Sequence, residues 1–140
     1  MMRTFVCIDD TDNLSQDTKS TGELARIMTE YIEEMGMGKC SFITRHQLYV
    51  HPRIPYTSHN SAMCFEIEHS EVIFDELRAF STDFLERECA KGSDPGLCIA
   101  ELEKITDPLL LINYGQRAKK EILSKELAYQ TAEKAGIHLS

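Results

Sequence analysis

Three aspartates follow directly on the first apolar segment of the chain, in the run Asp9-Asp10-Thr11-Asp12. Residues 5–8 are apolar, and residues 4–8 are β-prone, which predicts a buried strand over about residues 3–9. Because neighbouring carboxylates repel each other, each one raises the cost of ionising the next. A divalent cation such as Mg²⁺ removes this cost, since hard cations bind carboxylate oxygens. The run therefore favours a metal site at the end of this strand, and an Asx-turn with exposed carboxylates is the alternative.

A helix start follows in the segment Ser20-Thr21-Gly22-Glu23. Ser20 and Glu23 fit the S-x-x-E capping box, and a helix N-terminus attracts anions. Gly22 would let a ligand approach the backbone closely. Ser20 as a simple capping residue is the alternative reading. Because the acidic run and the helix start fall at the same end of the first βα unit, together they suit a metal-bound phosphate.

The remaining pattern predicts an α+β fold in one domain, residues 1–140. We expect helices over about residues 21–35, 70–90, 108–123 and 124–135, and further strands over 39–50, 61–68 and 97–102. This β-α-β-β-α-β order, followed by two helices, is typical of the split βαβ or ferredoxin-like arrangement. We therefore expect a four-stranded antiparallel sheet with helices on one face plus a C-terminal helical pair. A mixed sheet of another strand order is the alternative.

The segment from His51 to Asn60 has two prolines and no periodicity, so it is predicted to be a loop. Long irregular loops in compact domains are often functional. Arg53 is a candidate partner for a phosphate, and Asn60 is a candidate hydrogen-bond partner for a base. The alternative is that Ile54 and Tyr56 merely hold the loop against the core.

Composition limits the functions open to the chain. Its formal net charge is −8, and no segment is strongly basic. Since phosphate contacts dominate nucleic-acid affinity, we expect no direct nucleic-acid binding from this chain alone. We find no membrane-spanning run and no secretory signal, so we expect a cytoplasmic protein without membrane contact.

The cysteines and histidines show no metal-ligand spacing. The five cysteines are odd in number and form no C-x-x-C pair, so we expect reduced thiols rather than a zinc or disulfide site. His69 is expected to be a surface residue just before a helix.

The run Ile8-Asp9-Asp10-Thr11-Asp12 resembles one known family, together with three looser features: the Ser/Thr helix start, the Arg53-Ile54-Pro55 segment leading to Asn60, and the Asp94-Pro95-Gly96-Leu97 segment. This family is tRNA(Ile) agmatinylcytidine synthetase, and the similarity lies in its N-terminal kinase-like domain. It extends over about residues 4–102. The chain departs from the family where a basic, Trp-containing stretch is replaced by residues 55–60, and where a Gly-rich segment is expected near residue 140. The resemblance therefore also allows a domain truncated at its C-terminal end.

The resemblance implies a domain that binds ATP with Mg²⁺ and phosphorylates a cytidine. Carried over by position, Asp9, Asp10 and Asp12 would be the metal and phosphate ligands. Thr21 would be the threonine that takes part in phosphate chemistry, with Thr18 as a weaker candidate. Asp10 and Thr21 are thus the candidate catalytic residues.

The sequence leaves two functions open. The first is a Mg-nucleotide-binding protein, acting as an ATP-dependent phosphotransferase or ATPase related to tRNA modification. The cofactor-binding candidates are Ser20, Thr21, Gly22, Arg53 and Asn60. The second is a non-catalytic regulatory or scaffold domain with a decayed nucleotide site, for which a homodimer is an open possibility.

Overall fold

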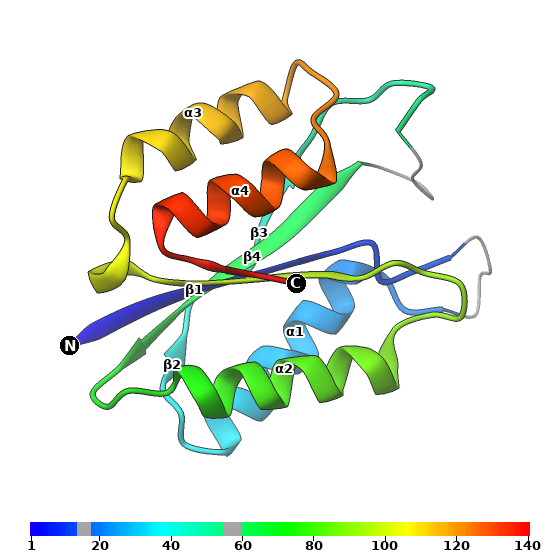
Figure 1. Ribbon diagram of the computed structural model, residues 1–140. Coiled ribbons are helices and arrows are strands. Elements are labelled where there is room, and N and C mark those ends of the chain that lie inside the picture. Colours follow the sequence, from blue (N-terminus) through cyan, green and yellow to red (C-terminus); the bar gives the residue numbers. More distant parts are fainter. Residues whose placement is uncertain (14–17, 55–59) are drawn as a thin grey trace.

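The computed structural model describes residues 1–13, 18–54 and 60–140 (Figure 1). In this part of the chain one antiparallel sheet has the order β2-β4-β1-β5-β6, and β3 also pairs with β4. The strands are β1 (Met2–Asp9), β2 (Lys39–Cys40), β3 (Thr44–Gln47), β4 (Ser61–His69), β5 (Gly96–Glu101) and β6 (His138–Leu139). The helical segments are α1 (Thr21–Glu34), α2 (Phe74–Glu88), the 3₁₀ segment η1 (Leu102–Lys104), α3 (Pro108–Ala118) and α4 (Lys125–Ala135).

The sheet separates two pairs of helices. Figure 1 shows α1 and α2 on one side of the sheet and α3 and α4 on the other. The predicted α+β class, the antiparallel sheet and the C-terminal helical pair are thus confirmed. The main core lies between the sheet and the α1–α2 pair, where side chains from β1, β4 and both helices are fully buried.

Strand β1 runs through the middle of the sheet and has two different faces. Val6 and Ile8 are buried in the core beneath α1 and α2. Because side chains alternate along a strand, Cys7 and Asp9 lie on the opposite face, toward α3 and α4. The last residue of β1, Asp9, is therefore directed away from the main core.

The predicted strand 39–50 is instead two short strands. Cys40 pairs with Ile67, and Thr44 pairs with Cys64. The segment from residue 40 to residue 44 is therefore one residue longer than the segment of β4 that lies opposite it. One extra residue of this kind is a β-bulge, which interrupts the ladder and redirects side chains. Phe42, within the bulge, is 94% exposed. The expectation of one continuous strand was wrong for this reason.

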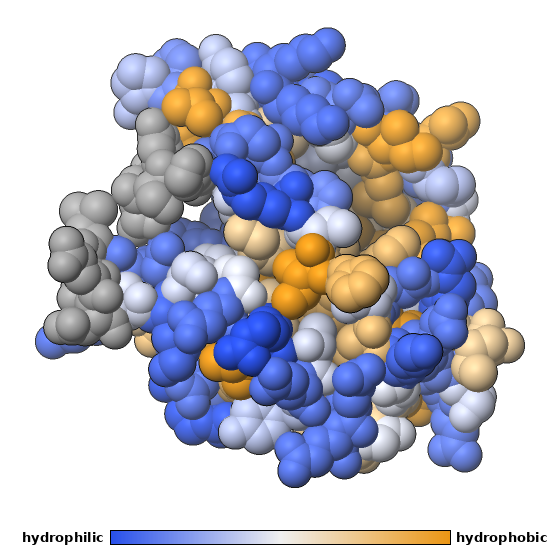
Figure 2. All heavy atoms as spheres, turned by 180° about the vertical axis from the view of Figure 1, so that it is seen from behind, coloured by the Kyte–Doolittle hydropathy of each residue, from blue (hydrophilic) through white to orange (hydrophobic). Residues whose placement is uncertain are grey.

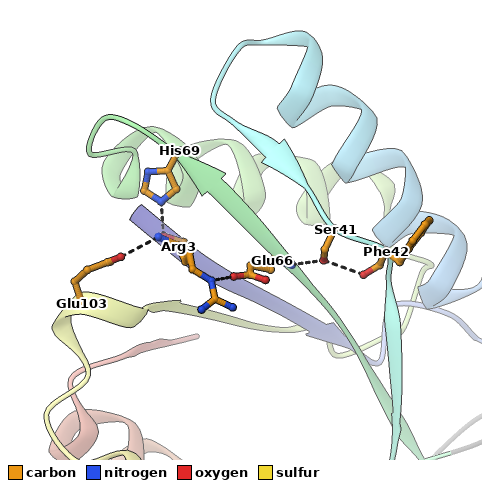
Figure 3. Close-up of polar contacts among 7 residues, drawn as sticks. Arg3, Ser41, Phe42, Glu66, His69 and Glu103 are labelled. Atoms are coloured by element: carbon orange, nitrogen blue, oxygen red, sulfur yellow. Dashed lines mark hydrogen bonds and ion pairs between the residues drawn. The ribbon is translucent and has the colours of Figure 1, made fainter. Parts of the chain in front are cut away.

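Helix α2 begins later than expected, at Phe74 rather than after Ser70. The ring Nδ1 of His69 donates to the carbonyl of Glu71 at 2.6 Å, which holds this part of the chain outside the helix. His69 itself is only 4% exposed, so its expected surface position was wrong. Figure 3 shows its ring against β1, where its Nε2 is 2.8 Å from Thr4 Oγ1.

The same view shows how the end of the sheet farthest from the acidic run is held together. The Arg3 guanidinium pairs with the Glu66 carboxylate across β1 and β4, and the Arg3 backbone N–H donates to Glu103 in η1 at 2.9 Å (Figure 3). Ser41 in turn contacts β4 beside Glu66. These polar contacts fix the start of β1 relative to its neighbours.

The C-terminal part differs from expectation in two places. Asp107 caps α3, with Pro108 in its first turn, but the helix ends at Ala118 rather than near residue 123. The carbonyl of Ala118 accepts a hydrogen bond from Tyr49 at 2.9 Å, which takes it out of the helical pattern. Strand β6 was not predicted, because two residues are too short to show any periodicity.

Apolar side chains are also present on the outside of the molecule. Helix α3 has no buried residue, and Leu109 and Ile112 are largely exposed. In Figure 2 hydrophilic residues cover most of the face shown, and hydrophobic residues gather in separate groups. No helix in the described ranges is long and apolar enough to cross a membrane.

Candidate functional site

The acidic run forms a tight turn at the end of β1. Asp10 adopts a left-handed backbone conformation, with φ of +49°, which redirects the chain directly after the strand. Aspartate tolerates this conformation better than most residues. Because β1 is antiparallel to both neighbours, its end meets the beginnings of β4 and β5. The Asp9 carboxylate accepts a hydrogen bond from the Gly96 N–H at 3.1 Å.

The carboxylates at this turn repel each other. Burial and the nearby charge of Asp10 raise the pKa of Asp9, although the hydrogen bond from Gly96 opposes the shift. Burial and the charges of Asp94 and Asp12 raise the pKa of Asp10. Asp94, which precedes β5, thus adds a fourth carboxylate to the group. A cation at this turn would relieve the repulsion.

Thr11 anchors the turn to the rest of the fold. Its side chain is completely buried, and its hydroxyl donates to the hydroxyl of Thr21 at 2.8 Å. Its carbonyl accepts from the Ala90 N–H at 2.8 Å, just after α2. The acidic run is therefore fixed to the start of α1 and to the connection between α2 and β5. Thr21 is only 8% exposed, and its hydroxyl is already engaged by Thr11.

The start of α1 has the predicted cap. The Ser20 hydroxyl accepts from the Glu23 N–H at 3.1 Å, so the capping role of Ser20 is confirmed. A Cβ on Gly22 would lie 3.8 Å from the Met63 side chain, which is ordinary contact. The surrounding protein atoms therefore do not require glycine here, and any need for close approach would come from a ligand.

The two predicted loop residues have different positions. The Asn60 side chain donates to the Tyr49 carbonyl at 2.6 Å, and the Asn60 carbonyl accepts from Leu48 N–H at 2.7 Å. Asn60 thus closes the connection between β3 and β4. Arg53 is exposed and lies outside the cavity lining. Residues 55–59 of the predicted loop, including Tyr56, lie outside the described residues.

A cavity of about 680 Å³ joins most of these residues. This volume is in the range of pockets that hold small molecules. One wall consists of predicted residues, namely Asp9, Asp10, Asp12, Ser20, Thr21, Gly22 and Asn60. Arg45 also lines the cavity. The other parts of the wall come from segments that sequence reasoning did not assign to the site; these include Asp94, Tyr114, Lys125, Tyr129 and Ser140.

The opposite wall comes mainly from α3, α4 and the end of the chain, because these lie on the Asp9 face of the sheet. Lys125 at the start of α4 lies 4.0 Å from the Asp94 carboxylate, and both side chains are largely exposed. Burial raises the pKa of Tyr114 from its ordinary value, with the Arg117 charge opposing. The sequence did give an indication for Asp94, because the segment Asp94-Pro95-Gly96-Leu97 belongs to the family resemblance. The sequence gave no indication for Tyr114 or Lys125, since it does not show that α3 and α4 fold back over β1.

The metal ligands remain a prediction. Across residues 1–13, 18–54 and 60–140, no group of three or more His, Cys, Asp or Glu side chains is arranged to hold a metal ion. The donor chemistry nevertheless fits a hard cation, because the clustered groups are carboxylates that repel each other.

Comparison with known proteins identifies structural relatives of the whole chain. No protein-family profile and no curated protein sequence matches it. Among solved structures, the complex of TiaS with an isoleucine tRNA and ATP matches with a TM-score of 0.82 and 26% identity, covering 100% of this chain and 32% of TiaS. The complex of TiaS with the same tRNA, AMPCPP and agmatine gives 0.76 and 25%, with coverages of 100% and 32%.

The same relative without ligands, apo TiaS, gives a TM-score of 0.79 at 26% identity, and the match covers 99% of this chain and 31% of that one. The chain thus spans about a third of the length of these relatives. Because TiaS is bound to tRNA in two of these structures, they give no support to the expectation that this chain does not bind nucleic acid. The resemblance predicted from the sequence is confirmed: this chain is similar, over its whole length, to about a third of TiaS, the agmatidine synthetase that acts on an isoleucine tRNA.

Proposed function

We propose that the cavity binds a nucleoside triphosphate together with Mg²⁺, and that the chain is an ATP-dependent phosphotransferase or ATPase related to TiaS. The observation that carries this proposal is the position of the cavity. It joins the acidic turn after β1 to the start of α1, in a fold shared with structures solved with ATP and AMPCPP. Its volume is sufficient for a ligand of this size.

Each wall of the cavity suits one part of such a ligand. Asp9, Asp10 and Asp12 would hold the ion, which would neutralise phosphate charge. The backbone N–H groups at the start of α1 would face the phosphates. Arg45 and Lys125 are the Lys and Arg side chains that line the cavity within the described ranges, and they would supply further positive charge.

A non-catalytic regulatory role is the second candidate, favoured by the environment of Thr21. Thr21 is 8% exposed, and its hydroxyl accepts a hydrogen bond from Thr11, which is a poor arrangement for a phosphoryl acceptor. The Arg45 guanidinium is also engaged, since it donates to Gln47 at 2.9 Å. A domain of this kind would bind nucleotide without transferring phosphate.

Calorimetry with Mg-ATP tests the binding proposal. Asp10→Asn should weaken Mg-ATP binding by about tenfold or more, because it removes one carboxylate charge from the ion. Asparagine tolerates the left-handed backbone at this position, so the turn should persist. Asp75→Asn on the exposed surface of α2 is the matched control and should bind like wild type. Equal heats from wild type and Asp10→Asn, or no heat from either, would reject the metal site.

Labelling with ATP separates the two candidate functions. We expect slow phosphorylation of Thr21 or none, because its hydroxyl is buried and already bonded to Thr11. Trypsin places Thr21 in peptide 20–26 and Thr18 in peptide 4–19, so mass spectrometry distinguishes them. Phosphate on peptide 4–19 alone would contradict the assignment of Thr21. Nucleotide binding without any label would favour the regulatory role.

A further inference from the structure

Three cysteines lie in one row across the sheet. Cys7 on β1 is directly opposite Cys64 on β4 and, on its other side, directly opposite Cys98 on β5. Their side chains lie on the face away from α1 and α2, because Val6 points into the core. All three are partly buried and reduced. The sequence shows no sign of this row, since only strand pairing brings these residues together.

The backbone contacts of β4 show how Cys7 and Cys64 face each other. The Glu66 N–H donates to Ser41 Oγ at 2.9 Å, and the Glu66 carbonyl accepts from the Ser41 N–H at 2.8 Å. Both backbone groups of Glu66 therefore point away from β1. Residues two apart in a strand point the same way, and the Cys64 carbonyl indeed accepts from Thr44 Oγ1 at 3.2 Å. Cys7 and Cys64 thus form a non-hydrogen-bonded pair.

This type of pair brings two side chains close together. In antiparallel sheets its Cα atoms are about 4.5 Å apart. Disulfides span Cα separations of about 4.4–6.8 Å, so this geometry lies within their range. The contact between the two thiols lowers the pKa of Cys64, although burial opposes this shift, and raises the pKa of Cys7.

Cys98 is less suited to react with Cys7. The Leu97 N–H and carbonyl both bond to Ser140 at 2.9 Å, so they point away from β1 toward β6. The next residue, Cys98, points the other way, which makes Cys7 and Cys98 a hydrogen-bonded pair with more widely spaced side chains. Burial raises the pKa of Cys98 to about 12, so Cys98 is a poor candidate for the first attack on a peroxide, which needs a thiolate.

We propose that Cys7 and Cys64 are a reversible redox pair, which a hydroperoxide converts into a cross-strand disulfide. The Cys64 thiolate attacks one oxygen of hydrogen peroxide, the O–O bond breaks, and a sulfenic acid forms on Cys64. The departing hydroxide takes up the proton that Cys64 lost on ionising and leaves as the first water. The Cys7 sulfur then attacks the Cys64 sulfur. The S–S bond forms as the S–O bond breaks, and the Cys7 proton leaves with that oxygen as a second water. The disulfide would lock β1 to β4 directly beside Asp9 and the cavity.

Peptide mapping of the full wild-type chain tests this proposal. The folded protein is treated with equimolar hydrogen peroxide, alkylated, digested with trypsin and analysed without reduction. Each of the five cysteines falls in a different tryptic peptide. We expect peptide 4–19, with Cys7, joined to peptide 54–78, with Cys64, and separation of the two by dithiothreitol.

Two variants serve as controls. Cys64→Ser should abolish the linkage, whereas Cys40→Ser, at a half-buried thiol on β2, should leave it unchanged. Melting curves of the reduced proteins check that both variants fold, and the wild-type result does not depend on either. Linkage of peptide 4–19 to peptide 92–104, a disulfide between two molecules, or oxidation without any linkage would each overturn the proposal.

Discussion

Replacing Phe84 with alanine is expected to destabilise the domain by about 3–5 kcal/mol, the usual cost of deleting a buried aromatic ring. Phe84 is 1% exposed, on the face of α2 that packs against the sheet. Its ring also packs against Tyr31 of α1 at 6.2 Å between centroids and against Phe80 at 5.7 Å. The cavity left behind would thus weaken the contact between the two helices as well as the core.

Phe42→Ala is the matched control, since it deletes the same ring from a side chain that is 94% exposed. Its effect should stay within about 0.5 kcal/mol, as for most surface substitutions. Urea unfolding followed by circular dichroism measures both variants. Small domains have a free energy of unfolding of only about 5–15 kcal/mol. Phe84→Ala should therefore unfold at a much lower urea concentration than wild type. Similar midpoints for the two variants would contradict this assignment of the core.

The burial of Phe84 illustrates what the sequence alone could predict. Ile73, Leu77, Phe80 and Phe84 follow the spacing of one helix face. Ile73, Leu77 and Phe84 are buried, and Phe80 is partly buried against the same core. The helix caps at Ser20 and Asp107 were also predictable, because capping depends on residues close together in the chain. Local periodicity and local capping therefore account for most of the elements that were predicted correctly.

The errors come from contacts between distant segments. The bulge at Phe42 depends on how Ser41 meets Glu66 on β4, and the late start of α2 depends on where the His69 ring points. The residues around Phe42 do not indicate the first contact, and the residues around His69 do not indicate the second. The expected surface position of His69 was wrong for the same reason. Its burial depends on packing against Thr4 on another strand, which the sequence around His69 does not indicate.

The candidate site was predictable on one wall and not on the other. The acidic run and Thr21 lie close together in the sequence, so their convergence could be inferred from one βα unit. The far wall depends on α3 and α4 returning over the Asp9 face, which places Tyr114 and Lys125 at the cavity. Their order along the chain does not indicate this face. Only the three-dimensional arrangement brings these residues to the acidic turn.

Replacing Gly96 with alanine should weaken Mg-ATP binding on the order of tenfold to a hundredfold while the domain stays folded, provided that the proposed function is correct. A Cβ at this position would lie 2.5 Å from Asp9 Oδ1 and 3.4 Å from its Cγ. The Asp9 carboxylate is held close by the Gly96 N–H, so it would have to move. Because the clash is with the end of a side chain rather than with backbone, the strain should be relieved locally, by moving one of the three carboxylates that the proposal assigns to the ion.

Gly115→Ala separates this effect from a general cost of adding a methyl group. Among the described residues, no atom outside the neighbouring residues and the backbone of α3 itself lies within 4 Å of the added Cβ. Alanine also favours a helix over glycine by roughly 0.5–1 kcal/mol. This variant should be slightly more stable and should bind Mg-ATP like wild type. Calorimetry and melting curves on the same samples give both quantities. If Gly96→Ala binds Mg-ATP like wild type while Asp10→Asn binds it weakly, the Asp9 carboxylate is not a ligand of the ion. Asp10 and Asp12 would then have to hold the ion without Asp9.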